Sequence, residues 1–452
     1  MSNRLEPQTM KPESKRGFKP KLRFPEFQGE PEWNTEKLGT VASLITERAG
    51  NKKCIPMSIT SGVGLVSQQE KFGRTIAGNQ YENYLVLQKN DFAYNKSATK
   101  EFPQGFIAKY SGDEPAAVPN SIFTCFRANK DGVVPDFLNY LFLGNHHGRW
   151  LRKYIEISAR AHGSLSVGDD DLMSLPVPLP RGEWSRAEQQ KIAECLTSLD
   201  KLIAAHGKKL DALGAFKEGL MQRLFPQPGG TAPRLRFPEF QNGGEWKEMS
   251  IQDMIDQRLI LGHLDGNHGE LYPRSEEFTQ DKDGIPYISA NDFVNGAVNF
   301  SKCKRLPIQR ARLFKKGVAK DGDILFAHNA TVGPVAKLNT AAEFVILSTT
   351  ATYFRCNVAL LLNDFLKFSL ASPTFVGQYS SVMSQSTRNQ VPITTQRKLK
   401  LFTTSFLEQQ RIASCLSALD DLIVGQTQKL DALKTHKQGL VQQLFPSSEV
   451  EA

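Results

Sequence analysis

The sequence lacks the features that mark several large classes of protein. Its six cysteines include no Cys-x-x-Cys pair, and its eight histidines show no metalloprotease or zinc-finger spacing. We therefore expect neither a disulfide scaffold nor a metal site, and a reducing cytoplasm as the location. No apolar run approaches the roughly eighteen residues of a membrane span. The polar, basic first residues lack the apolar core of a secretory signal peptide.

The motifs of several enzyme classes are missing as well. No Gly-x-x-x-x-Gly-Lys-Ser/Thr loop is present, which argues against an ATP motor, and no segment resembles the Asn-Pro-Pro-Tyr motif of amino-methyltransferases. Glu239, Glu245 and Lys247 could mimic a Glu…Glu-x-Lys nuclease site, but a matching stretch near the N-terminus has Asn34 in place of the lysine. A structural role of that stretch is therefore favoured, and the chain is expected to be non-catalytic on its own.

The composition is that of a globular protein with excess positive charge. Of 452 residues, 40% are hydrophobic and 23% are charged, and the net charge is +9. This length suggests roughly two to four domains. The basic balance fits a nucleic-acid partner without requiring one.

The chain is a tandem repeat, and this determines its whole interpretation. Residues 20–28 (PKLRFPEFQ) and 233–241 (PRLRFPEFQ) are identical at eight of nine positions. A longer repeat closes each half, because residues 188–226 and 408–446 match at 23 of 39 positions without a gap. The interiors share only a framework: Gly105, Lys109, Phe126, Arg127 and Asp136, for example, each match a residue 228 positions later. Two copies of one fold with different surfaces are therefore expected.

The closing segments predict long helices with a coiled-coil seam. Apolar residues alternate in steps of four and three over more than four heptads, which is a strong signal. The predicted seam consists of Ile192, Leu196, Leu199, Ile203, Leu210, Leu213 and Leu220 in the first copy, and of Ile412, Leu416, Leu419, Ile423, Leu430, Leu433 and Leu440 in the second. Polar residues interrupt it at equivalent places, His206 with Gln426 and Lys217 with Lys437. They either fix the register or mark local fraying.

The interiors read as a mixed sheet with helices along one side. Residues 285–293, 323–328 and 345–353 are β-branched or aromatic and bounded by Gly, Asn and Asp, which predicts strands. Residues 136–143 and 363–370 have the spacing of amphipathic helices. Residues 226–233 (PQPGGTAP) form a linker between the copies.

Candidate DNA-contacting side chains follow the predicted strands in polar loops. Asn, Gln, Arg and Lys can pair bidentately with base edges, and Ser and Thr can bind phosphate or base. The same residue types also fill ordinary polar loops. The candidates are Tyr94, Asn95, Lys96, Ser97 and Lys100 in the first copy, and Ser289, Asn291, His328, Asn329, Thr331, Thr387, Arg388 and Asn389 in the second. Apart from Gly105, which matches Gly333, the first copy has no clear counterpart of the segment 329–333.

Three features together carry a family resemblance. They are the LRFPEF-x-Glu-Trp opening, the Gly-Asp-Ile-Leu strand with its downstream Gly-Pro-Val-Ala, and the Glu-Gln-Gln-x-Ile-Ala…Leu-Asp-x-Leu-Ile helix. With them, about residues 20–446 resemble the specificity subunit of type I restriction-modification systems.

The resemblance implies an α+β fold with two tandem, pseudo-symmetric target recognition domains, separated by two long helices that form an antiparallel coiled coil. The implied parts are a disordered tail (1–19), target recognition domain 1 (20–185), a central spacer helix (186–226), the linker (227–232), target recognition domain 2 (233–405), a distal spacer helix (406–446) and a tail (447–452).

The resemblance also implies the function and the partners. Each domain would read one half of a bipartite, asymmetric sequence in double-stranded DNA. Two modification subunits would bind the helices and methylate adenine, and restriction subunits would translocate and cleave DNA. S-adenosylmethionine, ATP and Mg would then belong to these partners, and this chain would bind no cofactor itself. Two alternatives stay open: a coiled-coil scaffold without sequence-specific DNA binding, and the specificity subunit of a methylation-only or other phage-defence system.

Overall fold

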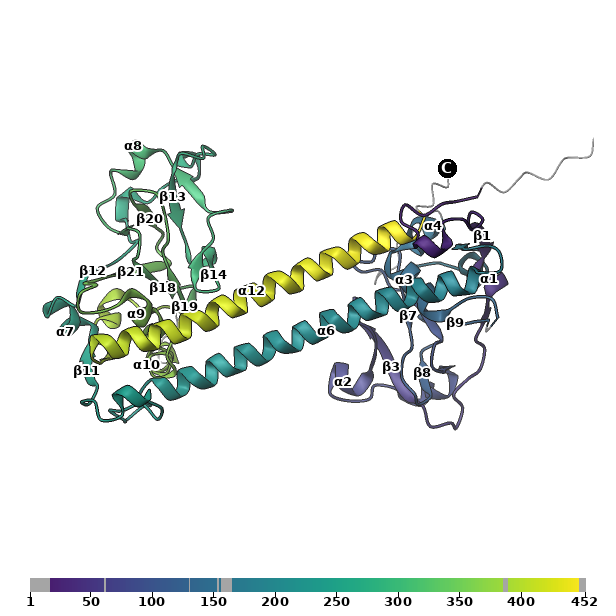
Figure 1. The fold of residues 1–452 in the computed structure, drawn as a ribbon, viewed down its shortest axis with the longest axis horizontal. Coiled ribbons are helices and arrows are strands. Elements are labelled where there is room, and N and C mark those ends of the chain that lie inside the picture. The colour runs from purple at the N-terminus through teal and green to yellow at the C-terminus, as the bar shows by residue number, and fades with distance from the viewer. Residues whose placement is uncertain are drawn as a thin grey trace, which may run out of the picture. The chain divides into compact units, whose positions relative to one another are not determined.

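The computed structural model describes residues 17–60, 62–129, 131–152, 154–155, 165–384 and 389–446. The chain divides into two units: unit 1 comprises residues up to Ala205 and from Leu430 onward, and unit 2 comprises His206–Lys429. Each unit therefore contains one part of each of the two long helices, α6 (Ser185–Leu224) and α12 (Phe406–Leu444), which are labelled in Figure 1. Both helices lie within two residues of the bounds expected for the two spacer helices, 186–226 and 406–446.

The structure corrects the boundary of the N-terminal tail. Residues 1–16 and 447–452 lie outside the described residues, but the expected tail extended to residue 19. Phe18 instead pairs with Trp33, exchanging two backbone hydrogen bonds of 2.8 and 2.9 Å. Residues 17–19 therefore belong to the described fold of unit 1, because Phe18 pairs with Trp33.

Both units are built on the same three sheets. In unit 1 the strand orders are β1-β10, β2-β9-β6-β7 and β4-β3-β8-β5. In unit 2 they are β11-β22, β12-β21-β18-β19-β15-β14 and β16-β13-β20-β17, so that only the additional β15 and β14 distinguish the two topologies. The pairs β3–β8 and β13–β20 are parallel, whereas the other pairs of the last sheet in each unit are antiparallel. The expected mixed α+β fold is confirmed.

The elements of unit 1 precede α6. The strands are β1 (Asn34–Lys37), β2 (Ala42–Leu44), β3 (Ile55–Thr60), β4 (Gly64–Ser67), β5 (Leu85–Leu87), β6 (Phe92–Asn95), β7 (Phe106–Lys109), β8 (Ala116–Val118), β9 (Phe123–Ala128) and β10 (Pro176–Leu179). The helices are α1 (Leu38–Val41), α2 (Gln68–Phe72), α3 (Pro135–Leu143), α4 (His146–Leu151) and α5 (Asp169–Met173), with 3-10 turns η1 (Pro25–Phe27) and η2 (Asn79–Asn83).

The elements of unit 2 lie between α6 and α12. The strands are β11 (Lys247–Ser250), β12 (Ile260–Asp265), β13 (Ile285–Ile288), β14 (Phe293–Val294), β15 (Ala297–Val298), β16 (Lys304–Leu306), β17 (Val318–Ala319), β18 (Ile324–Asn329), β19 (Thr331–Lys337), β20 (Val345–Leu347), β21 (Ala351–Cys356) and β22 (Lys400–Thr403). The helices are α7 (Ile251–Asp256), α8 (Ile308–Ala311), α9 (Asn363–Leu370), α10 (Pro373–Ser384) and α11 (Ile393–Gln396). The 3-10 turns are η3 (Pro238–Phe240), η4 (Gly269–Leu271), η5 (Ser275–Glu277) and η6 (Ala290–Asp292).

Two of the three predicted strands are interrupted. The predicted helices 136–143 and 363–370 are confirmed as α3 and α9, and the strand 323–328 as β18. Residues 285–293, however, form β13, the turn η6 and the first residue of β14, and residues 345–353 form β20, a turn and the start of β21. Each apolar run passes from one sheet to another, so a single strand could not serve both.

An Asp–Arg pair recurs at the turn before the central strand of each unit. The Asp91 carboxylate accepts from the Gln88 backbone N–H (2.6 Å) and forms two hydrogen bonds of 2.7 Å with Arg127. Asp323 does the same with Lys320 N–H (2.8 Å) and Arg355 (3.0 and 2.7 Å). A buried carboxylate requires such partners, so these repeated residues hold the sheet in place.

The opening segment of each unit is clamped to the start of a long helix. Buried Arg23 forms hydrogen bonds of 2.8 and 2.7 Å with Glu188, and this interaction raises the pKa of Arg23. Arg236 and Glu408 make the equivalent pair in unit 2, with two bonds of 2.7 Å. The next residue also has a structural role, because Gln189 accepts from the Val134 backbone N–H just before α3. The repeated Glu-Gln-Gln motif therefore joins each domain to its helix.

Each unit is completed by the end of the other copy's helix. In unit 1, Phe445 packs against Trp33 and Phe137, with ring centroids 6.5 and 5.1 Å apart. In unit 2, Phe225 packs against Trp246 and Phe365 at 6.0 and 5.7 Å. The repeated Leu-Phe-Pro that ends each helix thus serves the core of the unit formed by the other repeat.

Candidate nucleic-acid interface

The hairpin between β18 and β19 ends in a tight, exposed tip. Asn329 pairs with Thr331 across the hairpin, and Ala330 between them has a φ of 64°. This left-handed conformation is strained for a residue that carries a Cβ, so it needs support from its surroundings. Asn389 supplies that support: its backbone O accepts from Ala330 N–H (3.1 Å), and its Nδ2 donates to Ala330 O (2.7 Å).

The turn η6 lies beside the same tip. The Ala290 N–H donates to Thr350 Oγ1 (2.9 Å), and the His328 N–H donates to the backbone O of Thr350 (3.0 Å). Four of the sequence candidates of unit 2, namely Asn291, Asn329, Thr331 and Asn389, are therefore brought to one edge of the unit by elements that share backbone contacts. Asn291, Thr331 and Asn389 are exposed, and Asn329 is half-buried.

Two other candidates of unit 2 do not face solvent freely. His328 is buried, and its Nδ1 lies 2.9 Å from Thr352 Oγ1, so it is not available as a base-contacting side chain. Ser289 uses its hydroxyl to donate to Asp292 Oδ2 (2.8 Å), which stabilises η6. Thr387 and Arg388 lie outside the described residues. The prediction for His328 was wrong because β18 continues through it with this side chain facing the core.

The candidates of unit 1 are largely buried. Tyr94 is fully buried and donates from its hydroxyl to Gln104 O (2.9 Å), so the prediction that it contacts DNA was wrong. Asn95 is buried too, and its Oδ1 accepts from Ser97 N–H (3.0 Å). Lys96 lies 3.5 Å from Asp169. Ser97 is half-buried, and Lys100 alone of the five is exposed.

The two units differ most at this hairpin. The connection between β6 and β7 comprises residues 96–105, whereas β18 and β19 are joined by Ala330 alone. Gly105 and Gly333, which match in the two repeats, both have positive φ. The second strand of each hairpin therefore begins from an equivalent place in the frame. The same frame therefore carries a long loop in one unit and a tight tip in the other.

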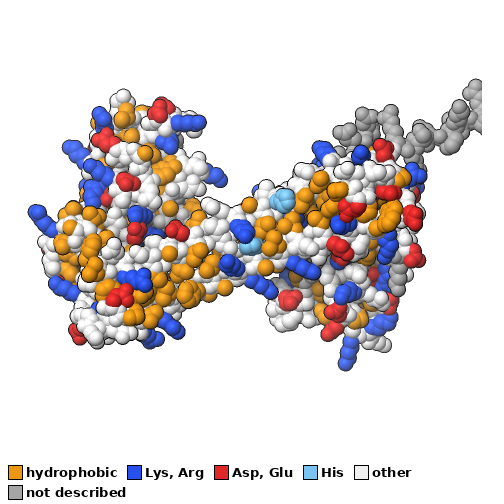
Figure 2. Space-filling view, in the orientation of Figure 1, with side chains coloured by type: hydrophobic (Ala, Val, Ile, Leu, Met, Phe, Trp, Pro, Cys, Tyr) orange, Lys and Arg blue, Asp and Glu red, His pale blue; other side chains and the backbone are white. Residues whose placement is uncertain are grey.

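A basic segment of unit 2 was missed in the sequence. Residues 300–320 contain eight Lys or Arg residues and no Asp or Glu, and they run through β16, α8 and β17. Lys and Arg side chains lie on this part of the unit in Figure 2. The exposed ones are Lys302, Lys304, Arg312, Lys315, Lys316 and Lys320. A one-signed run is the signal that could have identified it, because such a surface attracts phosphates.

Comparison with protein families identifies the second half of the chain directly. Residues 244–435 match the type I restriction modification DNA specificity domain, a range that includes the hairpin, η6 and the basic segment. The chain is similar to the specificity subunits of type I restriction-modification systems. The resemblance seen in the sequence is thereby confirmed, and the repeated frame extends it to the first half.

Two curated relatives of this chain are specificity subunits of type I restriction enzymes. The MjaX specificity subunit of Methanocaldococcus jannaschii is 24% identical over 347 residues, which cover 75% of this chain and 74% of the relative. The MjaVIII specificity subunit of the same organism is 21% identical over 299 residues, covering 65% and 66%.

Two solved structures have the same fold. A chain from a study of the assembly and conformational transition of a type I restriction-modification system is 17% identical, with a TM-score of 0.56; the match covers 92% of this chain and 98% of that one. The specificity subunit from M. genitalium is 14% identical, with a TM-score of 0.55 and coverage of 95% and 99%.

Helices α6 and α12 run antiparallel within each unit. In unit 1 the α6 residue Asp200 pairs with Lys437 of α12, and in unit 2 Lys217 of α6 pairs with Asp420 of α12. These are the same pair in the two repeats, and each lysine also lies over a ring, Tyr140 at 5.3 Å or Phe368 at 5.6 Å. The polar seam residues are thus partnered rather than frayed.

None of the fourteen predicted seam residues is exposed. Ile192, Leu196, Ile412, Leu416 and Leu430 are buried. The remainder are partly buried, namely Leu199, Ile203, Leu210, Leu213, Leu220, Leu419, Ile423, Leu433 and Leu440.

The described residues contain no cluster of three or more His, Cys, Asp or Glu side chains that could bind a metal ion. Glu239 of the nuclease-like fragment forms an ion pair with Arg411 (3.1 Å), and Glu26 pairs with Lys191 at the same distance. Within the same residues, no helix is long and apolar enough to cross a membrane.

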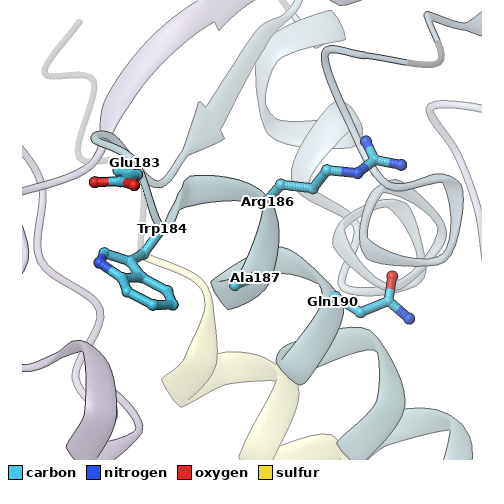
Figure 3. A pocket seen from close by; sticks show the side chains of 5 residues that line it. All are labelled: Glu183, Trp184, Arg186, Ala187 and Gln190. Atoms are coloured by element: carbon cyan, nitrogen blue, oxygen red, sulfur yellow. The ribbon is translucent and has the colours of Figure 1, made fainter.

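One pocket lies at the start of α6. Figure 3 shows Glu183, Trp184, Arg186, Ala187 and Gln190 around it. Trp184 is half-exposed, and Ala187 and Gln190 follow along one face of the helix. The pocket combines an aromatic face with polar rims, and no Ser, Thr, Cys or Lys side chain is among the residues that line it.

Proposed function

We propose that this chain is the DNA-reading subunit of a type I restriction-modification complex, and that each unit recognises one half of a bipartite, asymmetric target. One observation carries the proposal: a duplicated frame presents different side chains at the same hairpin edge. Unit 2 presents Asn329, Thr331 and Asn389 on a short tip, whereas unit 1 presents the loop 96–105. Two different readers on one scaffold suit two different half-sites.

The chemistry of the exposed groups supports DNA as the partner. Asparagine amides can pair bidentately with adenine, and threonine can contact bases or phosphates. The six exposed Lys and Arg side chains of residues 300–320 would neutralise backbone phosphates and release counterions. Positioning by phosphates and reading by a nearby polar edge is the usual division of work in a protein–DNA interface.

Catalysis would then belong to partner subunits. In this proposal two methyltransferase subunits bind the chain and methylate adenine, and restriction subunits translocate and cleave DNA. S-adenosylmethionine, ATP and Mg would be bound by those partners. The ion pairs that occupy Glu26 and Glu239 support a chain that reads DNA without cutting it.

Methylation mapping tests the proposal. Single-molecule sequencing would record adenine methylation across the genome of cells that express this chain with its neighbouring methyltransferase, and of cells that lack this chain. A methylated bipartite motif that disappears without the chain is the expected result. If the motifs are identical with and without it, the chain acts as a scaffold or not at all in target choice, and the proposal is wrong.

Exchange of one domain tests the division into half-sites. Residues 233–405 would be replaced by the corresponding domain of another specificity subunit. The methylated motif should change in one half and keep the other, because the frame that receives the domain is preserved in both repeats. A change in both halves would contradict independent reading.

A further inference from the structure

A hydrogen-bond network of buried polar side chains lies beneath the hairpin tip of unit 2. It links His263 on β12, Gln396 at the end of α11, Thr352 on β21 and His328 on β18. All four are buried, and Thr352 and Gln396 have no exposed surface. Three strands and a helix that are distant in sequence therefore meet through side-chain hydrogen bonds.

The hydrogen bonds of this network all run in one direction, from His263 to His328. Gln396 Nε2 has two hydrogens, and it donates to Thr352 Oγ1 (3.1 Å) and to Val391 O (2.9 Å). The Thr352 hydroxyl is then free to donate to His328 Nδ1 (2.9 Å), and Gln396 Oε1 accepts from His263 Nε2 (3.2 Å). Burial lowers the pKa of His328 and lowers that of His263 to about 4, so both rings are neutral near pH 7.

The same residues hold the backbone that forms the tip. His328 O accepts from Val391 N–H (2.8 Å), and Asn329 and Gln390 form a bridge beside it. Val391 is also tied to Gln396 through its own carbonyl. Thr352 and Gln396 therefore fix the segment 389–391 against residues 328–330, and that segment carries Asn389, the partner of the strained Ala330.

We propose that the hydrogen-bond network His263–Gln396–Thr352–His328 sets the specificity of the second half-site by positioning the hairpin tip, although none of these four side chains reaches the DNA. The inference rests on the proposed function. Thr352 and Gln396 are positioning residues: removing a hydrogen bond here allows Asn329, Thr331 and Asn389 to move relative to one another. A displacement of about 1 Å is enough to weaken a bidentate base contact.

The test uses a matched pair of substitutions in the assembled methyltransferase. Thr352→Val preserves shape and removes the hydroxyl, and Thr352→Ser keeps the hydroxyl. Thr124 occupies the equivalent place in unit 1, but it donates to Asp169 Oδ1 (2.7 Å) and is not part of this hydrogen-bond network. Thr124→Val is therefore the matched control. Each complex would methylate DNA libraries that are randomised in one half-site at a time.

The proposal predicts an effect confined to one half-site. With Thr352→Val, discrimination between bases should fall by about tenfold at one or more positions of the second half-site, as expected for the loss of one well-placed hydrogen bond. The first half-site should be unchanged, and Thr352→Ser and Thr124→Val should keep the wild-type second half-site. Wild-type discrimination by Thr352→Val would overturn the inference while leaving the proposed function intact. If the wild-type chain itself confers no motif, both are wrong.

Hydrogen exchange provides a measurement that does not depend on methylation. The amides of Ala330 and Val391 should exchange about tenfold faster in Thr352→Val than in wild type, whereas those of α9 should not change. If Thr352→Val lowers stability too far for a complex to form, Gln396→Met removes hydrogen bonds of the same network and serves in both measurements. Unchanged protection of residues 328–331 and 389–391 in both variants would overturn the inference.

Discussion

The side-chain nitrogen Nε2 of Gln426 lies 2.6 Å from Nδ1 of His206, its own counterpart in the first repeat, and also donates to the His206 carbonyl oxygen (3.0 Å). At this interruption of the apolar seam, the two polar side chains form hydrogen bonds with each other's residue inside unit 2. Such an interruption costs stability relative to leucine but fixes which positions face each other.

This pair predicts a specific double-mutant cycle. Gln426→Leu should destabilise the protein by about 1 kcal/mol, because His206 loses its partner. Adding His206→Leu should recover that loss or exceed it, since two leucines pack in the seam. Urea unfolding of the wild type, both single variants and the double variant measures this. Additive effects in the cycle would mean that the two side chains do not interact.

The buried clamp predicts large losses of stability in either unit. Arg23→Ala and Arg236→Ala should each cost about 3 kcal/mol or more, because Glu188 or Glu408 is left buried without its partner. Lys191→Ala is the control, since its pair with Glu26 is half-exposed and should contribute much less to stability. Chemical unfolding should rank the variants in this order; equal effects would contradict the structural role of the clamp.

Two buried histidines predict a loss of stability in mild acid. Burial lowers the pKa of His147 and of His263 to about 4, from an ordinary value of 6.5. The neutral rings therefore contribute stability that is complete above the ordinary pKa and is lost as the pH falls towards 4. At pH 5 the loss is about 2 kcal/mol for each histidine.

Thermal unfolding at pH 7.5 and pH 5.0, at equal ionic strength, measures this effect. The unfolding temperature of the wild type should be lower at pH 5.0. The difference should shrink in His263→Gln, which cannot be protonated. The same unfolding temperature at both pH values would show that the rings are protonated without cost.

The basic segment predicts a salt-dependent contribution to DNA binding. Replacing Lys315 and Lys316 by Gln should weaken binding of all DNA sequences alike and reduce the slope of log K against log salt by about 0.9 for each phosphate that is no longer neutralised. Lys247→Gln, an exposed lysine on β11, is the control and should leave the slope unchanged. Titration of the assembled complex with specific and nonspecific duplexes gives both slopes. A change in sequence preference without a change in slope would contradict binding of phosphates by these lysines.

The features that repeat in the sequence could be predicted from it, and the ones that depend on distant packing could not. The heptads predicted both long helices, and apolar spacing predicted α3 and α9. Tyr94 and His328 were mistaken for surface residues because a polar or aromatic group at a strand end gives no sign of which face it occupies. Burial of His328 depends on Thr352 and Gln396, which follow it by 24 and 68 residues, and no local pattern reveals that pairing.

The placement of Phe445 in the core around Trp33 has a consequence for synthesis. Leu444 and Phe445 are among the last described residues of the chain, yet they complete the hydrophobic core of unit 1. On the ribosome, the core of the first domain therefore stays incomplete until residue 445 has been translated. Unit 2 contains only residues between His206 and Lys429, so it has all of its core available earlier. We expect the second domain to fold first, against the usual order from N-terminus to C-terminus, and the interval to be the period in which the nascent chain is most exposed to aggregation.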